Sequence, residues 1–184
     1  MTLSLRWSIT SQSSGEPPFR IRPAGEADGA VLRSVIGSTL THPEGKGRRA
    51  GYAAAIQRDE LLVLERFDTH TKRWESCAFV EWHIRVDDVL TVRDAGTEGA
   101  SPHPGMIKQL FLELLRSLNP SEAIIKVRSD ATAWNEILGE IAGFVVEGTE
   151  YSRPHWFNIW RWTRQAAGRQ IRGAPRQAFG RSAR

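Results

Sequence analysis

The sequence predicts an α/β fold of the α+β kind, in which a mixed, mostly antiparallel sheet is flanked by helices. With 40% apolar and 25% charged residues, the chain of 184 residues has an ordinary globular composition. Three strand-like runs follow one another between residues 61 and 93, as in an antiparallel meander. Helix-like and strand-like segments then alternate between residues 106 and 142, which indicates a crossover onto a mixed sheet.

The first third of the chain is predicted to hold one strand and two helices. Residues 19–23 alternate in polarity and stop at a proline, which indicates a short strand. Apolar residues at helical spacing predict a helix over residues 26–40, and a shorter one is expected over residues 51–59. Residues 1–18 contain serine, glycine and proline without a periodic apolar face, so we expect an N-terminal arm.

The middle of the chain predicts three strands joined by polar turns. Residues 61–67 are dense in leucine and valine, and residues 89–93 form the third run. Between them, residues 75–85 alternate in polarity. Because side chains two residues apart on a strand share a face, Glu81 and His83 are expected to lie on one side, about 6–7 Å apart along the strand.

The last part of the chain predicts two helices and three strands. Residues 94–105 contain several glycines and prolines and are expected to form a loop. Leucine, isoleucine and phenylalanine recur at helical spacing after it, and Gly143 is the expected C′ residue of the second helix. The predicted helices cover residues 106–118 and 131–142, and the strands cover residues 123–127, 144–147 and 156–162.

The charge of the chain is distributed unevenly. The net charge is +4, but residues 163–184 contain six arginines and no acidic residue, so the remainder carries −2. We therefore expect a globular domain over residues 19–162 and a basic, flexible tail over residues 163–184. Such a tail can bind nucleic acid or an acidic protein partner, and it can equally be a solvated extension.

Several classes of protein are disfavoured by composition. No apolar run reaches the roughly 18 residues that span a bilayer, so no membrane segment is expected. The first residues lack the pattern of a secretory signal. Cys77 is the single cysteine, so no internal disulfide or cysteine zinc site can form, and the histidines lack metal-ligand spacing. These observations predict a cytoplasmic protein without a metal.

Two segments carry a resemblance to a known family. The opening FRIRPAGEADGAVLRSV resembles the first strand and acidic helix cap of the GNAT superfamily of N-acyltransferases. The segment WNEILGEIAGFVVEG is similar to the helix that ends in a Gly-Phe pair before the last two strands of that family. The predicted order of elements over residues 19–162 is also similar, so the resemblance covers nearly all of the globular part.

The resemblance implies a site for acetyl-CoA or another acyl-CoA. In the family, a strand splays from its neighbour, and a loop of the form R-G-x-G-x-G/A begins the next helix, whose backbone amides bind the pyrophosphate. Here Gly105 matches the first glycine, Pro104 replaces the basic residue, and Ile107 and Gln109 replace small ones. The bulky Ile107 could narrow the approach of the phosphates. The residues that the resemblance assigns to the cofactor are Val92, Arg93, Gly105, Met106, Ile107 and Lys108.

Catalysis requires a group that removes a proton from the amine and one that protonates the thiolate leaving group. The tyrosine that often supplies this acid in the family falls at Gly139 here. Glu81 and His83 are the best substitutes, as a carboxylate beside an imidazole or a base acting through water. The alternative is a half-exposed polar strand face. Asp94 is placed in the predicted loop, where its charge would oppose a phosphate unless it faces elsewhere.

Two functions therefore stay open. The first is an acyl-CoA-dependent N-acyltransferase that acts on an amine acceptor. The second is a catalytically inactive GNAT-like module that binds a protein or nucleic acid through its tail and its final strand. Trp156, Trp160 and Trp162 alternate along that strand, where aromatic residues can stack on bases. The same pattern fits core packing or a homodimer interface.

Overall fold

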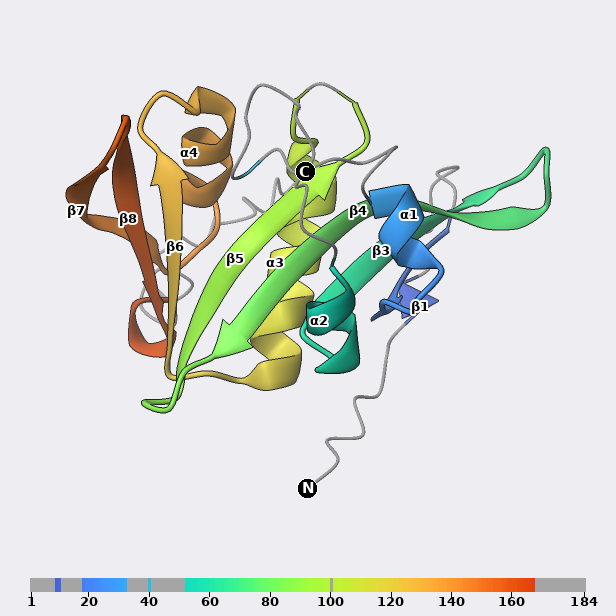
Figure 1. The fold of residues 1–184 in the computed structure, drawn as a ribbon, viewed down its shortest axis with the longest axis horizontal. Helices are drawn as coiled ribbons and strands as arrows, with labels where there is room; N and C mark the ends of the chain where they lie inside the picture. Colours follow the sequence, from blue (N-terminus) through green and yellow to red (C-terminus); the bar gives the residue numbers. More distant parts are fainter. Residues whose placement is uncertain (1–8, 11–17, 33–39, 41–51, 100, 168–184) are drawn as a thin grey trace, which may run out of the picture.

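The computed structural model describes residues 9–10, 18–32, 40, 52–99 and 101–167. These residues form one eight-stranded sheet in the order β1-β2-β3-β4-β5-β6-β8-β7. All neighbouring strands are antiparallel except β5 and β6, which are parallel. Figure 1 shows the sheet with helices packed against it, which confirms the predicted fold class.

The elements follow the predicted order closely. The strands are β1 Ile9–Thr10, β2 Phe19–Pro23, β3 Leu61–Asp68, β4 Arg73–Ile84, β5 Val89–Thr97, β6 Glu122–Arg128, β7 Phe144–Ser152 and β8 His155–Thr163. The helices are α1 Asp28–Val31, α2 Ala53–Gln57, α3 Pro104–Leu118 and α4 Thr132–Gly139. None of the described helices is long and apolar enough to cross a membrane.

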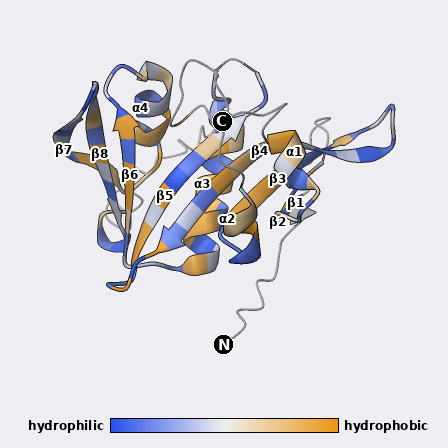
Figure 2. Ribbon diagram, viewed as in Figure 1, coloured by the Kyte–Doolittle hydropathy of each residue, from blue (hydrophilic) through white to orange (hydrophobic). Residues whose placement is uncertain are grey.

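The sheet separates two apolar clusters. The larger cluster joins the sheet to α3 and α4, and its buried members include Leu110, Phe111 and Leu114 from the apolar stripe of α3. The smaller cluster lies on the face that carries α1 and α2 and includes Tyr52 and Phe79. In Figure 2 the central strands carry much of the hydrophobic colour, whereas the turn between β3 and β4 is hydrophilic. Each cluster is therefore built from alternate residues of the same strands.

Several predicted boundaries need correction. Strand β7 runs to Ser152, beyond the predicted residue 147, and α3 begins at Pro104, inside the predicted loop. Strand β5 continues to Thr97, so the loop predicted over residues 94–105 is wrong for its first four residues. Helix α4 ends at Gly139, before the predicted boundary at residue 142, although Gly143 has the expected positive φ of 96°. Helix α1 begins inside the predicted helix over residues 26–40, whose residues 33–39 lie outside the described part.

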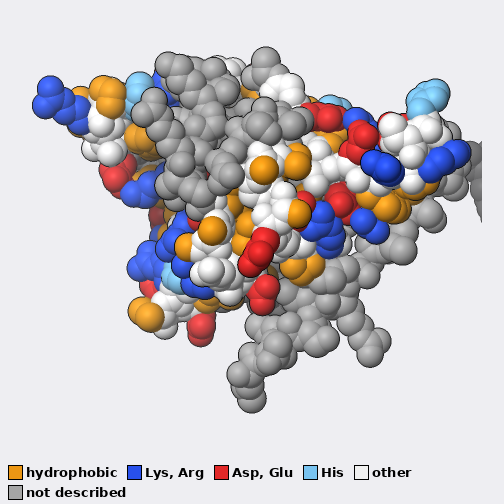
Figure 3. All heavy atoms as spheres, turned by 45° about the vertical axis from the view of Figure 1, so that its right-hand side comes forward, with side chains coloured by type: hydrophobic (Ala, Val, Ile, Leu, Met, Phe, Trp, Pro, Cys, Tyr) orange, Lys and Arg blue, Asp and Glu red, His pale blue; other side chains and the backbone are white. Residues whose placement is uncertain are grey.

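A network of ion pairs fixes α1 and β2 to the sheet. Arg22 donates hydrogen bonds to Asp28 at 2.7 and 2.9 Å and to Glu65 at 2.8 Å. Arg20 also pairs with Glu65. Burial raises the pKa of both carboxylates, but their contacts with arginine outweigh it, so both pKa values lie below the ordinary range. In Figure 3 acidic and basic side chains lie next to each other on this side of the molecule.

The tryptophans of the final strand divide between core and surface. Trp160 and Trp162 are buried in the larger cluster, which agrees with the core interpretation. Trp156 is 55% exposed, and its ring lies 5.2 Å from that of Tyr151 on β7. Beyond β8, residues 164–167 form a helical turn, and residues 168–184 lie outside the described part. The flexible tail therefore stays a prediction.

Candidate functional site

Strands β5 and β6 diverge near the middle of the sheet. Their parallel pairing covers Val89 to Val92 opposite Glu122 to Ile125, whereas β5 runs on to Thr97 and β6 to Arg128. Figure 1 shows the two strands separating toward their C-terminal ends. We call this backbone divergence the split. Strand edges that face each other without pairing can accept an extended ligand through main-chain hydrogen bonds.

A β-bulge lies on β5 where the split begins. Trp82 of β4 is paired with Val92, and Glu81 is paired with Asp94, so Arg93 is the additional residue on β5. The bulge leaves Val92 buried and Arg93 exposed. Because a bulge changes the direction of the residues that follow it, it turns the end of β5 away from β6. This explains how one sheet can contain a paired and a separated half of the same two strands.

The backbone of Ala95, two residues after the bulge, has partners outside the β4 ladder. Its carbonyl oxygen accepts a hydrogen bond from the Leu40 amide at 3.0 Å. Its own amide donates to Asp94 Oδ1 at 3.0 Å. A ligand that added to this edge through Ala95 would therefore exchange contacts with these groups.

Helix α3 begins close to the end of β5. His103 is its N-cap residue, and Nδ1 of its side chain accepts a 3.4 Å hydrogen bond from the Met106 amide. Pro104 occupies the first turn, where its missing N–H costs nothing. The His103 imidazole lies over Gly105, since a Cβ added there would meet the ring at 3.4 Å. The His103 amide in turn donates to Thr97 Oγ1 at 3.0 Å, which ties the helix start to β5.

The side chains of the first turn of α3 decide whether an anion can approach. Ile107 is 0% exposed and belongs to the larger apolar cluster, so it points into the core and does not narrow the approach. Met106 is also buried there. Lys108 is nearby, but its ammonium pairs with Glu140, which follows α4. The helix start therefore fits a phosphate through its backbone, provided that the His103 ring turns aside.

The candidate catalytic residues occupy the face that carries α2. Glu81 is 4% exposed and lies directly opposite Asp94 of β5. The Tyr52 hydroxyl donates to Asp94 Oδ2 at 3.2 Å. Two acidic side chains and a phenol thus lie beside the bulge. Sequence reasoning missed Tyr52 and Asp94, because Asp94 was placed in a loop and Tyr52 is remote in the sequence.

His83 has a different neighbour from the one expected. Its Nδ1 lies 2.5 Å from Oε1 of Glu60, which also accepts a 2.6 Å hydrogen bond from Arg58. Burial raises the pKa of Glu60, but the contacts with His83 and Arg58 outweigh it and leave the pKa below its ordinary value. His83 is therefore oriented by Glu60, which immediately precedes β3, the neighbour of β4 on the side away from β5.

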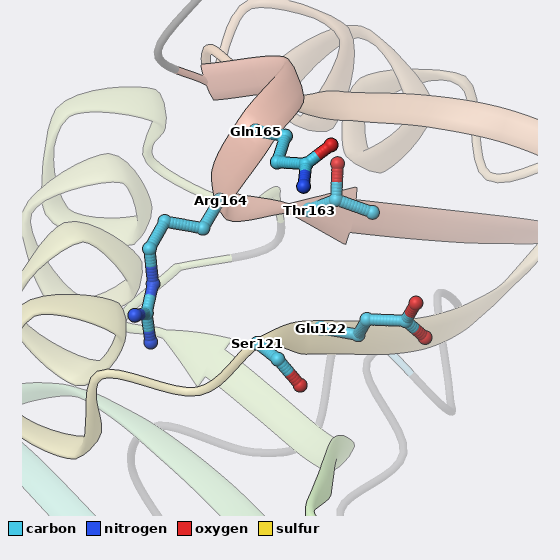
Figure 4. A pocket seen from close by; sticks show the side chains of 5 residues that line it. All are labelled: Ser121, Glu122, Thr163, Arg164 and Gln165. Atoms are coloured by element: carbon cyan, nitrogen blue, oxygen red, sulfur yellow. The ribbon is translucent and has the colours of Figure 1, made fainter.

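Two hollows lie outside the split. One of about 590 Å³ lies between α1 and α2, with small side chains such as Ala27 and Ala53 in its lining. The other, of about 370 Å³, lies where β6 begins and β8 ends (Figure 4). In Figure 4 the guanidinium of Arg164 points away from the Glu122 carboxylate. It donates to the carbonyl oxygens of Asn119 and Pro120 at the end of α3, so we assign this hollow a structural role.

Comparisons with known proteins identify the fold. No protein-family model and no curated protein matches the chain. Among solved structures, a GNAT-family acetyltransferase from Bacillus anthracis has a TM-score of 0.60 and 11% identity, covering 86% of this chain and 98% of that one. AAC(6')-Ib in complex with ribostamycin and coenzyme A has a TM-score of 0.58 and 14% identity, covering 82% of this chain and 96% of that one. The structure of yncA from Salmonella typhimurium with its cofactor acetyl-CoA has a TM-score of 0.57 and 14% identity, covering 79% of this chain and 93% of that one. The chain therefore has a GNAT-like fold.

Proposed function

We propose that the chain is an acyl-CoA-dependent N-acyltransferase that acts on an amine acceptor. The split beside a β-bulge, ending at the first turn of α3, is the observation that carries this proposal. It combines a strand edge for an extended acyl-pantetheine arm with backbone amides for a pyrophosphate. The solved structures of similar fold that contain coenzyme A or acetyl-CoA support the same assignment.

The proposed cofactor residues act mainly through their backbone. Val92 is the last residue of β5 that pairs with β6, Arg93 begins the separated edge, and the exposed Arg93 side chain offers a positive charge. Gly105 and Met106 present amides at the start of α3, while Ile107 anchors this turn in the core. Lys108 adds a charge that it shares with Glu140. Acyl-CoA, when bound, supplies the thioester that makes the acyl group transferable.

The proposed proton acceptor is a carboxylate on the α2 side of the split. An amine is protonated in water and becomes nucleophilic only when it loses a proton. Glu81 and Asp94 lie opposite each other on β4 and β5, where they can attract the cationic amine and accept its proton. His83 stays the second candidate, acting with Glu60 as its partner. Gly139 supplies no side-chain acid, so the thiolate would be protonated by another group or by water.

An inactive GNAT-like module in the cytoplasm is the second candidate. Two observations favour it: the His103 imidazole covers Gly105, and glycine occupies the position expected for the catalytic tyrosine. Such a module would bind a protein or nucleic acid through residues 163–184 and the final strand, or a second copy of the chain through that strand. The exposed Trp156 beside Tyr151 offers an aromatic surface for such a contact.

Acetyl transfer to a panel of amines tests the first proposal. We expect the chain with acetyl-CoA to acetylate at least one of spermidine, ribostamycin and a peptide with an unblocked N-terminus, detected by mass spectrometry. Glu81→Gln and Asp94→Asn should lower kcat by about 100-fold or more and keep cofactor binding, since they remove a proton acceptor. Glu113→Gln on α3, whose carboxylate pairs with Arg116, is the matched control and should be fully active.

The two candidates separate cleanly. If the chain binds neither acetyl-CoA nor coenzyme A at millimolar concentration, the transferase proposal is wrong. The module proposal predicts instead that removing residues 168–184 weakens binding to DNA or RNA and flattens its salt dependence, because each phosphate contact releases counterions. Unchanged affinity after this truncation would rule out a role for the tail.

A further inference from the structure

Helix α4 carries a buried indole N–H without a partner. Trp134 is 1% exposed, and its Nε1 has no hydrogen-bond acceptor among the residues that the structure describes. Nearly all buried polar groups in proteins are hydrogen-bonded, because leaving a donor unsatisfied costs free energy. An orphaned donor of this kind therefore needs an explanation.

The neighbouring tryptophans of the same cluster show what a satisfied indole looks like here. Trp160 Nε1 donates to Asn135 Oδ1 at 2.9 Å, and Trp162 Nε1 donates to the carbonyl oxygen of Ala142 at 3.1 Å. Among the described tryptophans, only Trp82 of β4 also has a buried indole N–H without an acceptor. Apolar surroundings alone thus do not prevent an indole from finding an acceptor in this core.

The position of Trp134 relates it to the split. Helix α4 follows the diverging end of β6, and α3 follows the diverging end of β5. The ring of Trp134 lies 6.4 Å, between centroids, from that of Phe111 on α3. Trp134 therefore packs between α3 and α4, the helices that follow the two separated strands along the chain. Figure 1 shows these two helices and the split. Trp82 differs from Trp134 in its position: it lies on β4, which is paired with β5 on both sides of the bulge and does not border the split.

The chemistry of the indole limits what it can recognise. An indole N–H donates and never accepts, so its partner must be an acceptor. Trp134 packs against Phe111 and belongs to the larger apolar cluster, so its surroundings disfavour an uncompensated charge. A neutral carbonyl oxygen meets both conditions, whereas a phosphate does not. The acyl-pantetheine arm carries two amide carbonyls and one thioester carbonyl.

We propose that Trp134 Nε1 donates a hydrogen bond to a carbonyl oxygen of the acyl-pantetheine arm held in the split. This inference rests on the proposed function and names a binding residue that the family motif does not contain. The contact explains why a tryptophan stands at this position of α4, where a phenylalanine would supply an apolar ring without an orphaned donor.

Trp134→Phe tests the contact, because it removes the N–H and keeps an aromatic ring. We expect coenzyme A and acetyl-CoA to bind about three- to tenfold more weakly by calorimetry, the loss of one hydrogen bond. The melting temperature without ligand should change little, because the smaller ring leaves a cavity while a buried unsatisfied donor is removed. Trp82→Phe is the matched control: it removes the other orphaned indole N–H and should bind both ligands like the wild type.

The two ligands locate the acceptor. A loss shared by both places it on a pantetheine amide, and a loss confined to acetyl-CoA places it on the acyl oxygen; either result supports the proposal. Equal affinity of wild type and Trp134→Phe would overturn it while leaving the proposed function intact. A wild type that binds neither ligand would overturn both.

A second measurement covers a variant that does not fold. In the wild type, the indole Nε1–H resonance of Trp134 should move downfield when acetyl-CoA is added, as expected for a donor that gains an acceptor. An unmoved resonance at saturating acetyl-CoA would also overturn the proposal.

Discussion

Replacing His103 by alanine should change stability and cofactor affinity in opposite directions. The His103 side chain is the N-cap of α3, accepting the Met106 amide at 3.4 Å, and its ring covers Gly105. The imidazole therefore engages the Met106 amide, one of the backbone donors that we assign to the pyrophosphate. Removing the imidazole leaves the first turn of α3 without its side-chain acceptor. The amides of Gly105 and Met106 are then open to an incoming anion.

The magnitudes follow from the geometry. Loss of an N-cap typically costs about 0.5–2 kcal/mol, and this long, exposed contact belongs at the lower end, about 0.5–1 kcal/mol. The gain in affinity comes from an amide that no longer has to exchange partners. We expect it to be about two- to tenfold, which corresponds to one modest hydrogen bond.

Denaturant unfolding and calorimetric titration with coenzyme A measure the two effects. His103→Asn is the control, because asparagine is a good N-cap residue and should keep the stability of the wild type. The reasoning is refuted if His103→Ala weakens coenzyme A binding, since the imidazole would then assist the ligand rather than compete with it.

Three further predictions concern the frame of the site. Gly143→Ala should destabilise the fold by about 3 kcal/mol in urea unfolding, because φ is 96° and the new Cβ would lie 2.6 Å from Trp162 Nε1; an unaltered midpoint would contradict this. Tyr52→Phe should cost about 1 kcal/mol by losing its bond to Asp94, and kcat should fall with little change in KM; unchanged turnover would remove Tyr52 from the site. Burial raises the pKa of Glu65, but its arginine partners hold it below the ordinary 4.5, so its stabilising effect exists above pH 4.5 and is lost as the pH falls through the folded-state pKa. Glu65→Gln should flatten the acid limb of stability against pH, and an equally steep limb would exclude this role.

The fold could be predicted from local patterns where one face of an element is buried. The apolar stripe of α3 and the leucine- and valine-rich β3 each have a single periodicity, and the structure keeps both elements. The end of β5 could not be predicted in this way. The composition of residues 94–97 is typical of a turn. The segment is nevertheless extended, because Ala78 to Glu81 of β4 pair with it. Such tertiary pairing overrides local propensity.

Some features of the candidate site could likewise be expected from the sequence, and others could not. The resemblance to the family, rather than a local pattern, implied a splayed strand followed by Gly105 at a helix start. The predicted apolar stripe of α3 included Ile107, and the structure confirms that this side chain faces the core, so it does not narrow the approach of an anion. The contact of Tyr52 with Asp94 joins residues that are 42 positions apart. The Glu60 partner of His83 likewise comes from a remote part of the sequence, just before β3, so no local pattern could reveal it.

Amide hydrogen exchange with and without acetyl-CoA tests most directly whether the split is the cofactor site. We predict that acetyl-CoA slows exchange over residues 93–97 at the end of β5 and over residues 105–108 at the start of α3, while β7 stays unchanged. Saturation with acetyl-CoA that leaves these two segments unprotected, or that protects a different part of the sheet, would contradict the account.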